Sequence, residues 1–329
     1  MSNLKEIYTK LPENLSDLPK AKSDKELEAV HYSVRHWMSS IPGSIKIGSN
    51  EHKQMVCKMF RETFNPYRPS FMNWPKLSKE ETDRLKSLPI WDIAVHTEGK
   101  ARLRMAAYVK ELLDPEMADA IARNAWEENR HKEVLSDLVD FYGIPLASEP
   151  SYKIPKDPEW AYLVTGFSEC WDSFFAFGLF AIAEKSGFFS KELIETFEPV
   201  MQEECRHILL FANWLAYHRA NLSFLARIKF EAKVLAVHGF LIYERIGIVN
   251  RVDSKGKNYC EDNNFTINGV NELSNKRTTL REFFQLCLSE NYRRFSGYDS
   301  RLLRPKTAPF LTELILKLLP NRLLNKPLG

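Results

Sequence analysis

Two copies of one short phrase recur in this chain, the first over residues 127–131 and the second over 203–207. Both read acid, Glu, any residue, Arg, His. Side chains three residues apart lie on the same face of a helix. Glu128 with His131, and Glu204 with His207, can therefore each present a carboxylate oxygen and an imidazole nitrogen to one point. Each phrase supplies half of a two-metal carboxylate site.

Chance alone explains a single Glu three positions before a His, because the chain has 8 His and many Glu. A lone match of this kind would mean little. The preceding acid and the Arg make each match much rarer, and finding both together rarer still. Two complete copies of the phrase therefore indicate a metal site, whereas a single Glu-x-x-His match would not.

Each phrase interrupts an otherwise mainly apolar helical stripe whose steps alternate between four and three. The first stripe is Met117, Ile121, Asn124, Glu128, His131, Leu135, Leu138 and Tyr142, and the second is Leu193, Phe197, Val200, Glu204, His207, Phe211, Trp214 and His218. A seam that tolerates polar residues near solvent explains one interruption but not two of the same kind. A buried carboxylate without a partner is costly, so a bound cation is the natural resolution.

The two preceding helices should supply one carboxylate each. Glu98 is the only acid on the inner stripe before the first phrase, and in an antiparallel hairpin turning at Asp114 it falls at about the height of Glu128. Before the second phrase, Glu169 and Asp172 (or Ser173) are predicted to face inward. Height matching slightly favours Asp172, whereas the longer side chain favours Glu169.

The repeated pattern resembles that of the soluble di-iron carboxylate proteins of the ferritin-like superfamily. The closest match is to the oxygen-activating branch, which includes bacterial multicomponent monooxygenases, ribonucleotide reductase small subunits and acyl-carrier-protein desaturases. The resemblance covers roughly residues 88 to 220. It implies two bound iron ions and these ligands: Glu98, Glu128, His131, Glu169, Glu204 and His207.

The same resemblance implies an outer layer around the ligands. Glu127 and Glu203 match acids that orient the imidazoles, and Arg130 and Arg206 match the arginines that pair with them. It also favours Glu169 over Asp172 as ligand, leaving Asp172 as an outer or proton-handling group. Oxygenases often place a Thr near the third-helix Glu; here Asp172 and Ser173 stand there and are the catalytic candidates.

Two differences between this sequence and known di-iron families narrow the class of protein it resembles. Leu135 occupies the position at which common reductase small subunits carry a radical tyrosine, so a tyrosyl-radical role is not expected. No Cys-x-x-Cys occurs, which argues against a rubrerythrin. Tyr108, Tyr142 and Tyr162 are interpreted as packing residues.

The predicted fold class is all-α: a ferritin-like four-helix bundle of two antiparallel hairpins with a long crossover, plus additional N- and C-terminal helices. The predicted bundle helices lie near 89–113, 115–143, 158–186 and 191–219, and the crossover spans 143–158. Further helices are expected near 25–40, 51–63, 222–248 and 278–294, with a short one after Ser78 and a flexible start over 1–24. We therefore predict three domains: an N-terminal helical extension over 1–88, the di-metal bundle over 89–220, and C-terminal helices with an exposed loop and a basic tail over 221–329.

The composition of the chain bears on nucleic-acid binding, on the cellular compartment and on membrane association. The 329 residues are 44% hydrophobic and carry a net charge of +3, which does not suggest nucleic-acid binding. Five scattered cysteines fit free thiols in a reducing cytoplasm, and we expect no signal peptide and no transmembrane span. A basic amphipathic tail after Leu302 is interpreted as packing on the bundle, with peripheral membrane contact as the alternative.

The leading hypothesis is therefore an oxygen-activating non-haem di-iron oxidase, with an Fe/Fe or Mn/Fe pair as cofactor and dioxygen as co-substrate. Phenylalanines of the third helix, interpreted first as core, would also suit a hydrophobic, acyl-like substrate. Hydroxylation, desaturation and N-oxidation stay open. No nucleotide-binding motif is visible, so a ferredoxin or reductase must supply electrons, and a homodimer is one expected assembly. The alternative is a ferroxidase-type or non-catalytic iron-binding protein.

Overall fold

The computed structural model describes residues 4–10, 32–66, 72–88, 91–146, 148, 151–253 and 278–326. Within these ranges every regular element is a helix, and an isolated bridge pairs Trp37 with Tyr298. The prediction of an all-α protein is confirmed.

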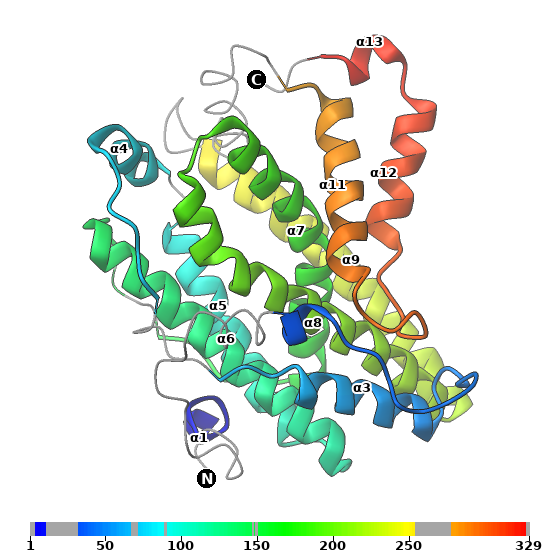
Figure 1. The fold of residues 1–329 in the computed structure, drawn as a ribbon. Helices are drawn as coiled ribbons and strands as arrows, with labels where there is room; N and C mark the ends of the chain where they lie inside the picture. Colours follow the sequence, from blue (N-terminus) through cyan, green and yellow to red (C-terminus); the bar gives the residue numbers. More distant parts are fainter. Residues whose placement is uncertain are drawn as a thin grey trace.

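Four long helices form the centre of the molecule (Figure 1): α5 (Trp91–Val109), α6 (Pro115–Tyr142), α7 (Pro158–Ser186) and α8 (Lys191–Asn221). Short connections join α5 to α6 and α7 to α8, so each pair is an antiparallel hairpin. Helix α5 contacts α6 and α7, and α8 contacts the same two helices. The inner faces of all four helices therefore surround one interior.

Local sequence signals set the ends of these helices. Asp114 caps α6 by accepting hydrogen bonds from the backbone N–H groups of Glu116 (3.0 Å) and Met117 (3.1 Å). Ser190 caps α8 in the same way through Leu193. Gly187 ends α7 in the left-handed conformation, with φ of 68°. These three predicted ends are confirmed, whereas α5 ends at Val109, before the predicted residue 113.

The remaining named helices surround this centre: α1 (Leu4–Thr9), α3 (Asn50–Glu62), α4 (Lys79–Ser87), α9 (Phe224–Asp253), α11 (Leu280–Phe295), α12 (Thr307–Leu318) and α13 (Asn321–Leu324). The expectation that residues 1–24 lack structure is wrong for 4–9, which are helical. Of the helix expected over 25–40, only 32–35 are helical among the described residues, and 25–31 lie outside them.

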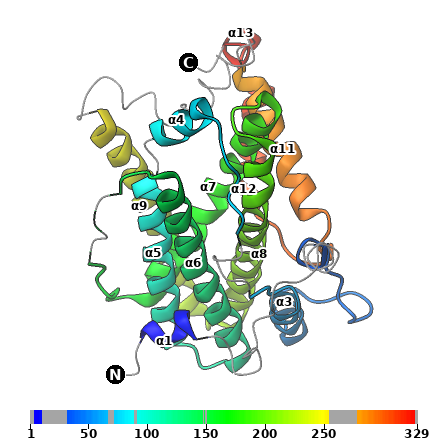
Figure 2. The same ribbon diagram turned by 60° about the vertical axis from the view of Figure 1, so that its left-hand side comes forward.

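The hydrophobic core does not stop at the four central helices. One buried cluster joins Trp37 and Phe60 from the N-terminal segment to Tyr108 in α5 and Phe230 in α9. Helix α3 contacts both α6 and α8, as the two ribbon views show (Figures 1 and 2). The N-terminal segment thus packs directly against the helices that carry the repeated phrase. The division of the chain into three domains stays a prediction.

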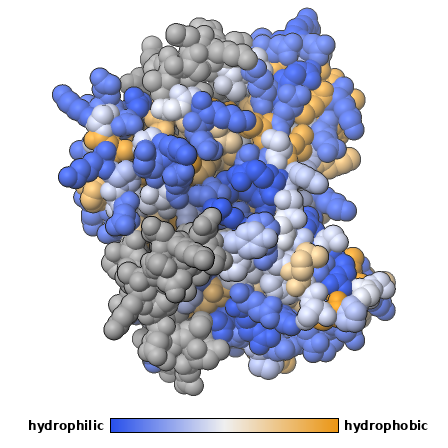
Figure 3. Space-filling model, viewed as in Figure 1, coloured by the Kyte–Doolittle hydropathy of each residue, from blue (hydrophilic) through white to orange (hydrophobic). Residues whose placement is uncertain are grey.

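The C-terminal helix α12 contacts α7 and α11 through a narrow face that buries Ala308 and Thr312. Phe310 and Leu318 point to solvent, and apolar side chains are visible among polar ones over α11 and α12 in Figure 3. Contact of this tail with a membrane surface stays a prediction. Among the described helices, none combines the length and the apolar character needed to cross a bilayer.

Candidate metal centre

Helices α6 and α8 bring the two halves of the repeated phrase together at the centre of the protein. Potential ligand atoms of Glu128, His131, Glu204 and His207 all lie within 4.8 Å of one another. Glu128, His131 and His207 are at most 2% exposed, and the Glu204 side chain is 16% exposed. Residues 76 positions apart therefore share one buried site, as the spacing within each phrase predicted.

The atoms that face this site have no hydrogen-bond partner. They are Nδ1 of both histidines and Oε1 of Glu128. Nδ1 of His207 lies 2.8 Å from Oε1 of Glu128, and Nδ1 of His131 lies 3.0 Å from Oε1 of Glu204, but neither contact has hydrogen-bond geometry. Buried polar atoms are normally satisfied, so a convergent unsatisfied set needs an explanation. Imidazole nitrogens and carboxylate oxygens that converge in this way fit a transition-metal ion.

The predicted acids of α5 and α7 point to the same place. Both carboxylate oxygens of Glu169 are buried without a hydrogen-bond partner. Burial, and then the negative charges of Glu128 and Glu204, raise the pKa of Glu169 well above its usual value. Burial, and then the negative charges of Glu128 and Glu204, raise the pKa of Glu98 in the same way. These acids of α5 and α7 are therefore close enough to Glu128 and Glu204 to feel their charges, and their role as ligands stays a prediction.

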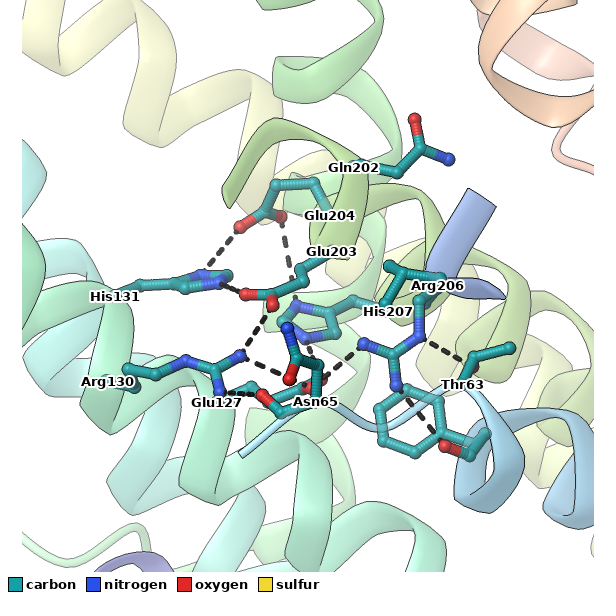
Figure 4. A network of polar contacts seen from close by, with 12 residues as sticks. Thr63, Asn65, Glu127, Arg130, His131, Gln202, Glu203, Glu204, Arg206 and His207 are labelled. Atoms are coloured by element: carbon teal, nitrogen blue, oxygen red, sulfur yellow. Dashed lines mark hydrogen bonds and ion pairs between the residues drawn. The ribbon is translucent and has the colours of Figure 1, made fainter. Parts of the chain in front are cut away.

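A second layer of acids holds the histidines, and it does so across the two helices. Nε2 of His131 on α6 donates to Oε2 of Glu203 on α8 at 2.8 Å. Nε2 of His207 on α8 donates to Oε2 of Glu127 on α6 at 3.0 Å. Because an ionised carboxylate only accepts, each imidazole donates from Nε2, which leaves Nδ1 as the nitrogen that can bind a metal once it has lost its own proton. Figure 4 shows this arrangement.

Two buried arginines hold these outer acids in turn. Arg130 lies 2.7 Å from Glu203, and Arg206 lies 2.8 Å from Glu127. The same three-residue chain of His, Glu and Arg thus occurs twice, and in each copy the histidine on one helix is held by a Glu of the other helix. The two acids and the two arginines are at most 1% exposed. Residues that the resemblance implied as an outer layer do contact one another.

The arginines are anchored by a segment that sequence reasoning did not connect with the site. Nε of Arg206 donates to the Thr63 hydroxyl at 2.8 Å, and its Nη2 donates to the carbonyl of Phe60 at 3.2 Å. Arg130 donates to the carbonyl of Asn65. These acceptors lie at and just after the C-terminal end of α3 (Figure 4). Backbone carbonyls carry no sequence signature, so only Thr63 offered any signal, and a weak one.

The charges of the site are strongly interdependent. Burial opposes ionisation of Glu128, but the nearby His207 outweighs it and lowers the pKa of Glu128 to about 2. Burial likewise disfavours the charged imidazoles, yet contacts with Glu203 and Glu204 raise the pKa of His131 to about 10. In His207, the carboxylates of Glu128 and Glu127 have the same effect and raise the pKa to about 10. The carboxylates attract positive charge strongly, as a cation site must.

Asp172 is placed differently from the prediction. Its side chain is exposed and accepts a hydrogen bond from the Ser168 hydroxyl at 2.7 Å. The expectation that Asp172 faces inward is therefore wrong, because three residues rotate a helix by about 300° and leave Asp172 about 60° away from Glu169, on the exposed side of α7. Ser173 is buried. A catalytic role for either residue stays a prediction that no contact described here tests.

The aromatic side chains near the site are mainly packed against one another. Tyr108 and Tyr162 stack with ring centroids 4.7 Å apart, and both belong to the buried core. Of the α7 phenylalanines, Phe167 packs on Phe211 and Phe177 lies under Arg294. The packing interpretation is confirmed for these rings. An apolar substrate pocket beside the site stays a prediction.

Close approach of α7 to α8 depends on a small residue near Glu169. A Cβ at Gly166 would lie 2.1 Å from the Phe211 ring. Any side chain there would therefore push the two helices apart. Gly166 lies one turn before Glu169, so it helps to set how far that carboxylate reaches into the interior.

The chain gives no significant match to a protein-family model, a curated protein or a solved structure. The site is thus defined by its own residues: a buried Glu/His cluster, in a helical protein, that could hold a metal ion.

Proposed function

We propose that this protein is an oxygen-activating di-metal oxidoreductase of ferritin-like type, acting on a small hydrophobic organic substrate. The observation that carries the proposal is the convergence of ligand atoms from Glu128, His131, Glu204 and His207, of which both Nδ1 atoms and Oε1 of Glu128 have no hydrogen-bond partner. Glu98 and Glu169 extend this cluster to the six ligands of a two-metal site.

The arrangement of the ligands along the chain supports the ferritin-like assignment. The first helix of each hairpin provides one Glu, and the second provides a Glu-x-x-His pair, as in the di-iron carboxylate bundles. The connection between the hairpins, from 143 to 157, is much longer than the connection inside either one. A bundle of this type also places its metals on the inner faces, where Glu128, His131, Glu204 and His207 converge.

Charge balance supports two metal ions rather than one. Two guanidinium groups, of Arg130 and Arg206, contact the buried acids. Facing them are six carboxylates, of Glu98, Glu127, Glu128, Glu169, Glu203 and Glu204. With metal bound, all six acids would be ionised and both histidines neutral, which leaves four negative charges that two divalent cations would neutralise. Without metal, protons on Glu98, Glu169 and the two histidines take the place of that positive charge, as their raised pKa values indicate. Burial makes such neutralisation necessary, because unpaired interior charge is costly.

The protein's own part in the chemistry is to hold the ligands in place before the metals bind. Glu203 and Glu127 fix the tautomer and the ring orientation of His131 and His207, and the arginines fix the acids. Anchoring to α3 prevents the arginines from turning away. A bound pair of iron ions would supply the reduction of dioxygen, with electrons from a ferredoxin or reductase.

Apolar residues on the inner faces support a hydrophobic substrate. Leu135 follows His131 by one turn, Phe211 follows His207 by one turn, and both are buried. Such a lining excludes water and favours an apolar group beside the metals. An acyl chain fits this description, and hydroxylation, desaturation and N-oxidation are all compatible with it.

Metal content is the first test. Purified protein reconstituted anaerobically with ferrous iron should bind two equivalents by elemental analysis. Glu128→Ala and His207→Ala should each lose most of this iron, whereas Glu195→Ala should retain it, because Glu195 is an exposed acid on α8 that pairs with Lys191. Full iron content in Glu128→Ala and His207→Ala would refute the metal site.

Oxygen consumption then separates the two iron chemistries. An oxygenase should turn over dioxygen repeatedly only with a reductant and an organic substrate. A ferroxidase should consume oxygen in proportion to added ferrous iron, with no reductase and no substrate. The second result would leave the metal site intact and replace the proposed reaction with the iron-binding alternative.

A further inference from the structure

Helix α9 is apolar on two opposite faces, but the described part of the structure covers only one of them. The covered face consists of Phe230, Val234, Val237 and Leu241, spaced by four, three and four residues and all at most 7% exposed. Lys233 ties this side to the bundle through ion pairs with Asp157 (2.9 Å) and Glu159 (2.7 Å). This face is the expected packing side of a bundle helix.

The opposite face carries a second apolar stripe with the spacing of a helix–helix seam. Its positions step by three and four: Leu225, Ile228, Ala232, Leu235, Gly239 and Ile242. All six are exposed, with Leu225 at 71%, Leu235 at 74% and Ile242 at 63%. Phe224 and Tyr243 flank the two ends at 76% and 75% exposure. Figure 2 shows α9 at the outside of the bundle.

Single exposed apolar residues are common, but a continuous stripe of them is not. A helix that is hydrophobic all round is normally buried all round. Seven large apolar side chains of α9 are at least 36% exposed: Phe224, Leu225, Ile228, Leu235, Phe240, Ile242 and Tyr243. A contiguous exposed apolar stripe of this kind marks an interaction surface.

The order of large and small residues identifies the partner. We infer that α9 pairs with α9 of a second copy of this chain, antiparallel, about a two-fold axis between positions 232 and 235. In this register Ala232 faces Leu235 and Gly239 faces Ile228, each time a small residue opposite a large one. Leu225 then faces Ile242 at both ends.

This self-complementarity favours a second copy over other occupants of the face. An isologous interface requires one surface to match itself after a two-fold rotation, and the sequence from 225 to 242 does so. A lipid surface rewards apolar area but does not need a small residue opposite each large one. Alternation of this kind lets two helices interdigitate.

The oligomeric state tests the interface. Full-length protein should elute in light scattering at twice the 38.3 kDa of one chain. Leu235→Glu should weaken the dimer by about a hundredfold or more, because a charge would be buried at the centre of the seam. The matched control is Phe310→Glu, which places the same charge on an exposed apolar residue of α12, 61% exposed. This variant should remain dimeric.

A size-swap series tests the register itself. A Cβ at Gly239 meets nothing within 4 Å inside the chain, so Gly239→Leu should leave the fold unchanged. In the dimer this leucine would meet Ile228 of the second copy, so the variant should dissociate. Ile228→Ala added to Gly239→Leu restores one large and one small residue at that layer and should restore the dimer.

Three results would overturn the proposal. A monomeric wild-type chain at 100 µM would exclude the dimer, and binding of that monomer to phosphatidylcholine vesicles would assign the face to lipid. A dimer that survives Leu235→Glu but not Phe310→Glu would move the interface to α12. Failure of the double variant to rescue Gly239→Leu would refute the register. None of these measurements depends on bound metal, so they stand apart from the proposed oxidoreductase activity.

Discussion

His131 and Glu203, 72 positions apart, meet at 2.8 Å between Nε2 and Oε2. The mirror pair, His207 and Glu127, meets at 3.0 Å. Because each pair links α6 to α8, the histidine that faces the centre from one helix is positioned by the other. Loss of either acid should therefore disturb the site without removing a ligand.

Glu203→Ala tests this positioning. Removing the acid leaves the buried Arg130 without its 2.7 Å partner. The free energy of unfolding should therefore fall by about 3–5 kcal/mol. Metal affinity should fall about 10- to 100-fold, as is typical when a residue that orients a ligand is lost. Glu203→Gln keeps an acceptor for His131 and should lose less affinity. Chelator competition and urea unfolding measure the two effects, and equal affinity losses in both variants would contradict the orienting role.

The third-helix ligand can be decided between two acids of α7. Glu169→Gln keeps the shape of a buried side chain but removes its charge, so iron content should fall to at most about half of the wild-type level if it bridges or holds one ion. Asp172→Asn changes an exposed acid on the same helix and should leave iron content unchanged. Elemental analysis after desalting gives the comparison, and the reverse result would restore Asp172 as the ligand.

Thr63 links the N-terminal segment to the outer layer of the site. Thr63→Val keeps the volume but leaves Nε of Arg206 without its 2.8 Å acceptor. A buried donor left unsatisfied costs about 1–3 kcal/mol, and the free energy of unfolding should fall by that amount. Thr196→Val is the control, because the Thr196 hydroxyl is exposed and bonds only within α8. Equal losses in the two variants would show that Thr63 does not support the arginine.

Gly166 should be intolerant of even one methyl group. Gly166→Ala would place a Cβ 2.1 Å from Phe211, so α7 must shift away from α8. We expect about 1–3 kcal/mol of destabilisation and weaker iron binding, because Glu169 moves with α7. Gly239→Ala made in the monomeric Leu235→Glu variant, where the added Cβ meets nothing within 4 Å, should instead stabilise that variant by about 0.5–1 kcal/mol. Thermal unfolding with and without iron tests both, and an unaffected Gly166→Ala would argue for a looser helix contact.

Asp299 gives a pH dependence that is independent of the metal site. Its hydrogen bonds from Arg301, and then from backbone N–H groups that include Ser39, outweigh burial and lower its pKa from 3.8 to about 2. A depressed folded-state pKa stabilises the protein above the unfolded pKa, so this contribution, about 2 kcal/mol, is lost as pH falls from about 4 to 2. Asp299→Asn should unfold with a shallower pH slope over this window. Identical slopes for the variant and the wild type would contradict the assignment.

The sequence by itself determined the helices and the chemistry of the site. Alternating steps of three and four placed Glu128 with His131, and Glu204 with His207, on inner faces, because helical periodicity is local. Caps such as Asp114 and Ser190 fixed where helices begin for the same reason. The all-α class and the four-residue cluster followed from these signals alone.

Only the tertiary structure decided which residues meet across helices. Height matching could not separate Asp172 from Glu169, because the rotation of a helix about its axis is set by packing, here with Gly166 against Phe211. The crossed pairs His131–Glu203 and His207–Glu127, and the anchoring of Arg206 by Thr63, join segments far apart in the chain. No local pattern encodes such contacts, since they depend on how separate helices pack rather than on the residues within any one of them.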